Sequence, residues 1–195
     1  FGTALERGGD YCDIYFERKS YTYIGLEDHI VNKVSVLFSI GAGIRVIKGD
    51  RTGFSFSEDL SMEALKSAAK TAAQIADSDL TAAIPGLTRV EPLNLYKEDA
   101  NHSLPVQKKI EIVKRIDEKI FNRDPRIVKG NASIQEENTV VLIASSDGKI
   151  SGDFRPMTQI SASCTAEEKG RRESNGHSIA SRHGLGYYTD AMVQD

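Results

Sequence analysis

Four histidines are the side chains in this sequence best suited to metal or proton chemistry: His29, His102, His177 and His183. None has a second histidine three, four or five residues away, the spacing that places two zinc ligands on one face of a helix. His177 and His183 are six residues apart in a stretch rich in glycine and serine, with no carboxylate beside them. The sequence therefore predicts ordinary surface histidines and no metal ligand in this chain.

Hydroxyl, thiol and carboxylate groups form no recognisable catalytic pattern either. The chain lacks a Gly-x-Ser-x-Gly turn, the local signature of an exposed nucleophilic serine. Cys12 and Cys164 stand in strand-like segments without an activating neighbour, so we expect buried, reduced thiols. The adjacent acidic residues Glu136-Glu137 and Glu167-Glu168 are interpreted as solvated hairpin ends. We expect no catalytic residue among these side chains.

Two glycine pairs could bring the backbone close to a ligand. Gly41-Ala-Gly43 precedes a predicted strand and lacks the Lys-Ser/Thr of a phosphate-binding loop, so close backbone packing explains it. The second pair lies in a glycine- and aromatic-rich segment near the C-terminus. Its residues His183, Gly184, Gly186 and Tyr187 are our candidates for contact with a passing substrate. The alternative interpretation is a flexible linker.

Composition and charge exclude several classes of protein. The 25 basic and 28 acidic residues give a net charge of −3, without the basic face that phosphate-dominated binding of nucleic acid requires. The pairs Lys108-Lys109 and Arg171-Arg172 are interpreted as solvated surface. No apolar run approaches the roughly 18 residues of a membrane span. We expect a cytoplasmic protein that binds neither membrane nor nucleic acid directly.

Period-two alternation and aromatic or β-branched residues predict a series of strands. The turn at Lys48–Arg51, where Gly49 supplies a positive φ, closes a tight hairpin, and Asp147-Gly148 and Lys169-Gly170 mark two more turns. The predicted strands are 10–18, 20–26, 30–38, 43–48, 52–57, 126–135, 139–145, 149–153, 157–167 and 171–177.

Two helices are predicted, at about 61–77 and 105–121. Ser61 is a suitable N-cap for the first, whose buried stripe consists mainly of alanine. The second has an aliphatic stripe and a charged face that includes Lys109. The sequence thus predicts an α+β fold, a mostly antiparallel sheet of hairpin units with two helices packed on it. Residues 1–79 and 105–182 would form two subunits joined by the long connection 80–104.

The two predicted subunits share a sequence pattern. Glu17–Asp28 and Glu136–Asp147 both run from an acidic residue through a β-rich segment to an aspartate at a turn, and the interval between them is 119 residues. A further turn follows each aspartate after a similar interval, near Gly49 and Gly170. Either a duplication or the turn chemistry common to all hairpins explains this pattern.

Several segments, in the same order, resemble the TldD/PmbA family, whose members were once called modulators of DNA gyrase. The resemblance covers most of the chain outside the connection 80–104, and it is closer to the TldD branch than to the PmbA (TldE) branch. The segments that carry it are Tyr11–Glu17, Leu26–Val31, Gly41–Leu65, Val140–Gly148, Arg155-Pro156 and Glu167–Glu173.

The resemblance implies a zinc metallopeptidase acting on unfolded peptides. TldD-like proteins carry His-Glu-x-x-x-His on a helix, where two histidines bind zinc and the glutamate is the general base. Bound zinc would lower the pKa of a water molecule towards about 7. This chain contains no His-Glu pair, so the motif maps onto none of its residues. We expect residues 1–195 to be a non-catalytic N-terminal domain, with the zinc domain downstream.

The resemblance also implies a role and partners for such a domain. It would restrict access of peptide substrates and support a homodimer or a TldD/PmbA-type heterodimer. Two alternatives stay open: a non-enzymatic binding or regulatory module, and an inactive PmbA-like partner subunit. The next 100 or so residues of the gene would distinguish them, because the first alternative predicts a stop codon and the second a degraded zinc motif.

Overall fold

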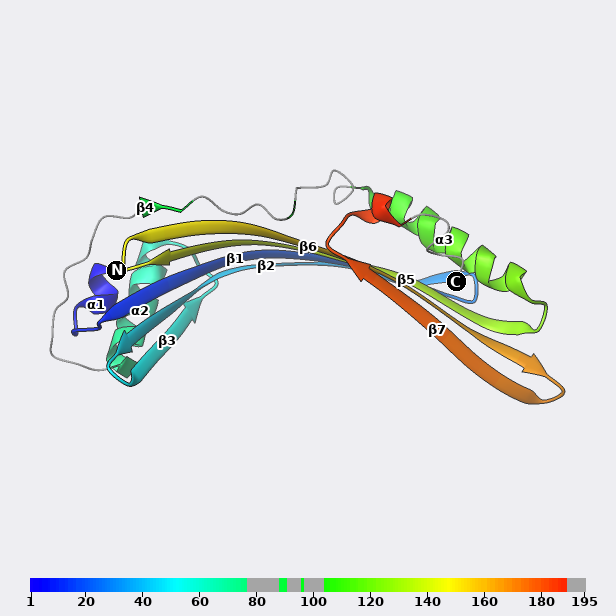
Figure 1. The fold of residues 1–195 in the computed structure, drawn as a ribbon, viewed down its shortest axis with the longest axis horizontal. Helices are drawn as coiled ribbons and strands as arrows, with labels where there is room; N and C mark the ends of the chain where they lie inside the picture. Colours follow the sequence, from blue (N-terminus) through cyan, green and yellow to red (C-terminus); the bar gives the residue numbers. More distant parts are fainter. Residues whose placement is uncertain (77–87, 91–95, 97–103, 189–195) are drawn as a thin grey trace. The chain divides into compact units, whose positions relative to one another are not determined.

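The computed structural model describes residues 1–76, 88–90, 96 and 104–188 (Figure 1). Its helices are α1 (Gly2–Leu5), α2 (Met62–Ala76), α3 (Val106–Arg123) and the 3-10 helix η2 (Leu185–Tyr187). Its strands are β1 (Tyr11–Glu27), β2 (Ile30–Lys48), β3 (Arg51–Ser57), β4 (Thr88–Arg89), β5 (Ile127–Ser145), β6 (Lys149–Glu168) and β7 (Arg171–Ser181). In the described part of the chain, no helix is long and apolar enough to span a membrane.

The strands belong to one sheet in the order β3-β2-β1-β5-β6-β4, with β7 pairing with β6 as well. The β2–β3 and β6–β7 pairs are antiparallel, whereas the short β4 runs parallel to β6. The predicted α+β fold of hairpin units with two main helices is confirmed. Both helices lie within two residues of their predicted bounds.

The strands are longer than the sequence pattern predicts. Segments 10–18 and 20–26 form the single strand β1, and segments 126–135 and 139–145 form the single strand β5. Likewise, β2 and β6 each join two predicted strands. Residues 19, 39–42, 136–138 and 154–156, which separate the predicted strands, all belong to strands in the structure. The expected interruptions are therefore wrong.

The described chain divides into two compact units that interleave along the sequence. Unit 1 comprises 1–19, 39–95 and 139–154, and unit 2 comprises 20–38, 96–138 and 155–195. Four long strands, β1, β2, β5 and β6, contribute residues to both. This division differs from the sequential subunits 1–79 and 105–182, because each long hairpin enters both units. Most of the connection 80–104 lies outside the described residues.

Unit 1 is built on close packing of α2 against β3. Ser61 caps the helix as expected, accepting a hydrogen bond from the amide of Ala64 at 3.3 Å. The buried face of α2 is entirely alanine, which lets the helix approach the sheet. Gly53 completes the fit, since a β-carbon there would lie 1.9 Å from the carbonyl oxygen of Ala72. The core adds Leu5, Cys12, Ile44 and Val46.

Unit 2 packs α3 on one face of β1, β5 and β6. Val113 and Ile116 of the predicted stripe are buried against Ile24, Leu26 and Ile134. Lys109 corrects the prediction, because its side chain is 5% exposed and forms an ion pair with Glu136 of β5, itself 2% exposed. Neither residue is therefore solvated, and Glu136 lies inside a strand rather than at a hairpin end.

Candidate functional site: a neutral polar face of unit 2

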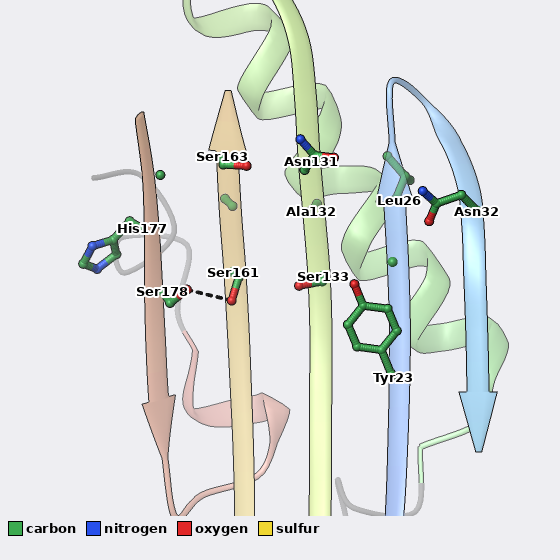
Figure 2. A pocket seen from close by; sticks show the side chains of 13 residues that line it. Tyr23, Leu26, Asn32, Asn131, Ala132, Ser133, Ser161, Ser163, His177 and Ser178 are labelled. Carbon is green, nitrogen blue, oxygen red and sulfur yellow. Dashed lines mark hydrogen bonds between the residues drawn. The ribbon is translucent and has the colours of Figure 1, made fainter. Parts of the chain in front are cut away.

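The sheet of unit 2 has one apolar and one polar face because side chains alternate along each strand. On β1, Ile24 and Leu26 pack into the core beneath α3, whereas Tyr23 lines the opposite face. On β5, Ile134 is buried in the same core and Ser133 lines the polar face. Figure 2 shows this polar face towards the viewer, with α3 behind the strands.

A hollow of about 340 Å³ lies on this polar face. Its lining includes no Lys, Arg, Asp or Glu, although these four types make up 27% of the chain. Small residues and neutral hydrogen-bonding groups predominate, so we call this surface the neutral face. Its lining residues are Tyr23, Gly25, Leu26, Asn32, Asn131, Ala132, Ser133, Ser161, Ala162, Ser163, Gly176, His177 and Ser178.

Hydrogen bonds organise only part of the neutral face. Ser178 of β7 donates to the hydroxyl of Ser161 on β6 at 2.7 Å, the dashed line in Figure 2. The side-chain amide of Gln159 donates to the same hydroxyl at 3.3 Å. Asn131 and Ser163 are exposed beside this pair. The face can thus offer neutral donors and acceptors to a molecule that covers it, without the desolvation cost of burying a full charge.

A second hollow, of about 570 Å³, lies between the last turns of α3 and the strands β6 and β7. Its wall on α3 combines the aliphatic Ile116 and Ile120 with the basic Lys119 and Arg123. Cys164 contributes to the strand side. His177, one of the predicted surface histidines, lines both hollows.

A histidine–carboxylate pair, which the sequence does not reveal, joins a hairpin turn to α3. Nδ1 of His29 lies 2.6 Å from Oδ2 of Asp117, whose side chain is 4% exposed. The ring also packs against Phe121, with centroids 4.1 Å apart and the ring planes tilted by 41°. Asp28 and His29 both have positive φ, an uncommon conformation for residues other than glycine. These contacts hold the β1–β2 turn against the helix, which is a structural role.

The candidate residues His183, Gly184, Gly186 and Tyr187 lie in and beside η2. His183 and Gly186 are exposed, while Gly184 is buried. The residue that this segment places in the core is Leu185, 5% exposed among the residues packed under α3. Their proposed contact with substrate stays a prediction, because nothing in this geometry tests it.

The described side chains do not form a metal site. No group of three or more His, Cys, Asp or Glu residues in ranges 1–76 and 104–188 is placed to hold an ion. Cys12 and Cys164 are free, as predicted, although Cys164 is only half-buried. Burial raises the pKa of the Cys12 thiol to about 12, so the thiol stays protonated near neutral pH. The zinc implied by the resemblance does not fit the donors found here.

Two models of known protein families match this chain. One describes PmbA/TldA metallopeptidase domain 1 and matches residues 12–76. The other describes the PmbA/TldA metallopeptidase central domain and matches residues 99–194. Together they cover most of the chain.

Curated relatives and solved structures agree with these matches. A metalloprotease TldD homolog from Haemophilus influenzae is 30% identical over all of this chain, and one from Buchnera aphidicola is 28% identical over 92% of it. The chain spans 41% and 37% of these two relatives. A proposed DNA gyrase modulator from Bacteroides thetaiotaomicron shares the fold, with a TM-score of 0.71 and 20% identity over 93% of this chain and 43% of that one. TldE from Thermococcus kodakarensis also shares it, with a TM-score of 0.67 and 16% identity over 91% of this chain and 41% of that one.

Proposed function

Because this chain belongs to the PmbA/TldD metallopeptidase family, we propose that it is a non-catalytic N-terminal region of a TldD-like zinc metallopeptidase. In this role it restricts access of unfolded peptides to a catalytic centre held elsewhere in the polypeptide. The observation that carries the proposal is the combination of the family match with a described structure whose donors do not assemble a metal site.

The share of its relatives' length that this chain spans supports the proposal that substrate access and catalysis belong to different parts of the polypeptide. The chain spans only 41% of the Haemophilus influenzae relative, so most of a protein of that kind lies outside the region matched here. A zinc ion bound there would activate water and polarise the scissile carbonyl. Residues 1–195 would contribute the surface along which substrate arrives.

The same proposal includes a partner. A homodimer or a TldD/PmbA-type heterodimer would place this region beside a second subunit, which limits entry to chains that are already unfolded. The cytoplasm is the compartment we assign, since the free thiols Cys12 and Cys164 suit a reducing environment.

Metal analysis and peptide hydrolysis test the proposal. The complete gene product and residues 1–195 are purified in parallel and assayed with unfolded casein and by elemental analysis. We expect stoichiometric zinc and hydrolysis from the complete product, and neither from residues 1–195. Stoichiometric zinc in residues 1–195 would contradict the assignment. A complete product without metal or activity would favour an inactive partner subunit or a regulatory module.

A further inference from the structure

We propose that the neutral face of unit 2 binds the main chain of an extended peptide. This inference rests on the proposed function, because it assigns the peptide that a metallopeptidase of this family would admit to a particular surface of this chain. It concerns the hollow on β1, β5, β6 and β7 (Figure 2), not the candidate residues around η2.

The absence of formal charge from this lining is the first argument. An unfolded peptide exposes neutral amide and carbonyl groups at every residue, whatever its side chains. A surface of serine hydroxyls and asparagine amides can donate to and accept from those groups. Lys or Glu on the same surface would favour peptides of one charge. The neutral face therefore suits a protein that must accept many different sequences.

The spacing of the polar groups is the second argument. Ser161 and Ser163 are two residues apart on β6, and Asn131 and Ser133 are two residues apart on β5, so each pair is separated by about 6.8 Å along its strand. An extended peptide presents its same-side carbonyl groups at the same interval. A peptide lying along the strands can therefore meet both members of a pair in one register.

The size of the side chains is the third argument. Beside these polar groups, Gly25 of β1 and Gly176 of β7 line the same face of the sheet. At Gly176 a β-carbon would lie 2.8 Å from that of Ser163, so no larger residue fits there without displacing its neighbour. At Gly25 a β-carbon would lie 2.9 Å from the ring of Tyr23, so the two glycines let the hydroxyl-bearing side chains of Tyr23 and Ser163 lie close to the sheet. Asn131 and Ser163 are exposed at this surface, available to a peptide that lies on it.

Peptide binding is tested by fluorescence anisotropy with the complete gene product stripped of metal by EDTA, so that the probe is not cleaved. The probe is a fluorescein-labelled decapeptide of Gly, Ser, Ala and Thr with blocked ends. Ser163→Phe and Asn131→Phe each fill part of the hollow with an aromatic ring. Ser39→Phe is the matched control, an exposed serine of β2 outside both hollows. Circular dichroism establishes that each variant is folded.

We expect saturable binding that Ser163→Phe and Asn131→Phe each weaken at least tenfold and that Ser39→Phe leaves unchanged. Ser163→Ala, which removes one hydroxyl without adding bulk, should weaken binding by about two- to tenfold. Binding should also be nearly equal at 50 and 500 mM NaCl, since no charge pairs form. A benzophenone in the probe should cross-link to β5, β6 or β7.

Three results would overturn the inference: no saturable binding, binding that neither aromatic substitution changes, or binding that collapses with salt. A change of oligomeric state in Ser163→Phe, with peptide binding intact, would instead identify the face as an interface between subunits. Casein hydrolysis by the metal-loaded product is measured separately. If hydrolysis persists while the probe fails to bind, the peptide-binding inference is wrong and the proposed function still holds. If hydrolysis and zinc are both absent, the proposed function is wrong as well.

Discussion

Replacing Gly53 by alanine should loosen the attachment of α2 to the sheet. The added β-carbon would lie 1.9 Å from the carbonyl oxygen of Ala72 and 2.7 Å from the amide nitrogen of Ala76. Carbon–oxygen contacts in proteins are about 3.3 Å or longer, so the helix or the strand must withdraw by about 1.4 Å. Both atoms belong to the backbone of α2, and no side-chain rotation can relieve the clash.

The magnitude follows from the cost of overpacking. Inserting a methyl group into a packed core costs about 1–3 kcal/mol, and a fixed helix backbone places this case at the upper end. Alanine also lowers the conformational entropy of the unfolded chain, which offsets about 0.4–1 kcal/mol of this destabilisation. We therefore expect the free energy of unfolding to fall by about 2 kcal/mol, or the melting temperature by roughly 4–8 °C for a chain of this size.

Thermal and urea unfolding, followed by circular dichroism, measure the effect. Gly152→Ala is the control, because a β-carbon at that position of β6 would have its nearest neighbour, the carbonyl oxygen of Val141, at an ordinary 3.5 Å. We expect this control to change stability by less than about 0.5 kcal/mol. Equal melting temperatures for Gly53→Ala and Gly152→Ala would refute the close packing of α2 on β3.

Three further outcomes are expected. Lys109→Met leaves Glu136 buried without its cation and should lower the free energy of unfolding, measured by urea titration, by about 3–5 kcal/mol. The double variant Lys109→Met/Glu136→Leu should recover most of this loss. Equal losses in the two variants would contradict a buried ion pair. The hydrogen bond from Arg126 lowers the pKa of Asp124 to about 2, so this contribution to stability is complete above about pH 4 and lost as the pH falls through 2. The melting temperatures of the native chain and Arg126→Gln should accordingly differ at pH 5 and converge near pH 2, and a constant difference would exclude this origin. Iodoacetamide at pH 8 should spare Cys12 in the folded chain and label it in guanidinium; rapid labelling of the folded chain would refute its burial.

Local features of the fold are the ones that sequence predicts well. Gly49 has φ of +53° at the turn expected of it, and Ser61 caps α2. Both depend on residues within a few positions of each other, whose conformational preferences act without the rest of the chain. The bounds of α3 follow from its aliphatic periodicity in the same way. The prediction fails for strand length, since pairing across the sheet overrides interruptions of the local pattern.

The candidate site shows the same limit. Tyr23, Asn131 and Ser161 come from three strands that are not joined as hairpins by short turns in the same unit, and no local signal marks them as one surface. The sequence does not reveal the buried partner of Lys109 either, because this lysine follows Lys108 and is assigned to the charged face, whereas Glu136 lies on a strand 27 residues further on. The sequence points to His183, Gly184, Gly186 and Tyr187 as candidates for contact with substrate. The residue of this segment that packs into the hydrophobic core is Leu185.

Sequence alone determined the turns, the two helices, the α+β class and the family, because these depend on local conformational preference and on short motifs read in order. Tertiary structure decided which distant residues became neighbours: the ion pair beneath α3, the alanine face of α2 against Gly53, and the hollow of unit 2 whose lining contains no Lys, Arg, Asp or Glu. Each depends on strand pairing and helix packing between segments many residues apart, whose free energy belongs to the assembled sheet rather than to any one segment.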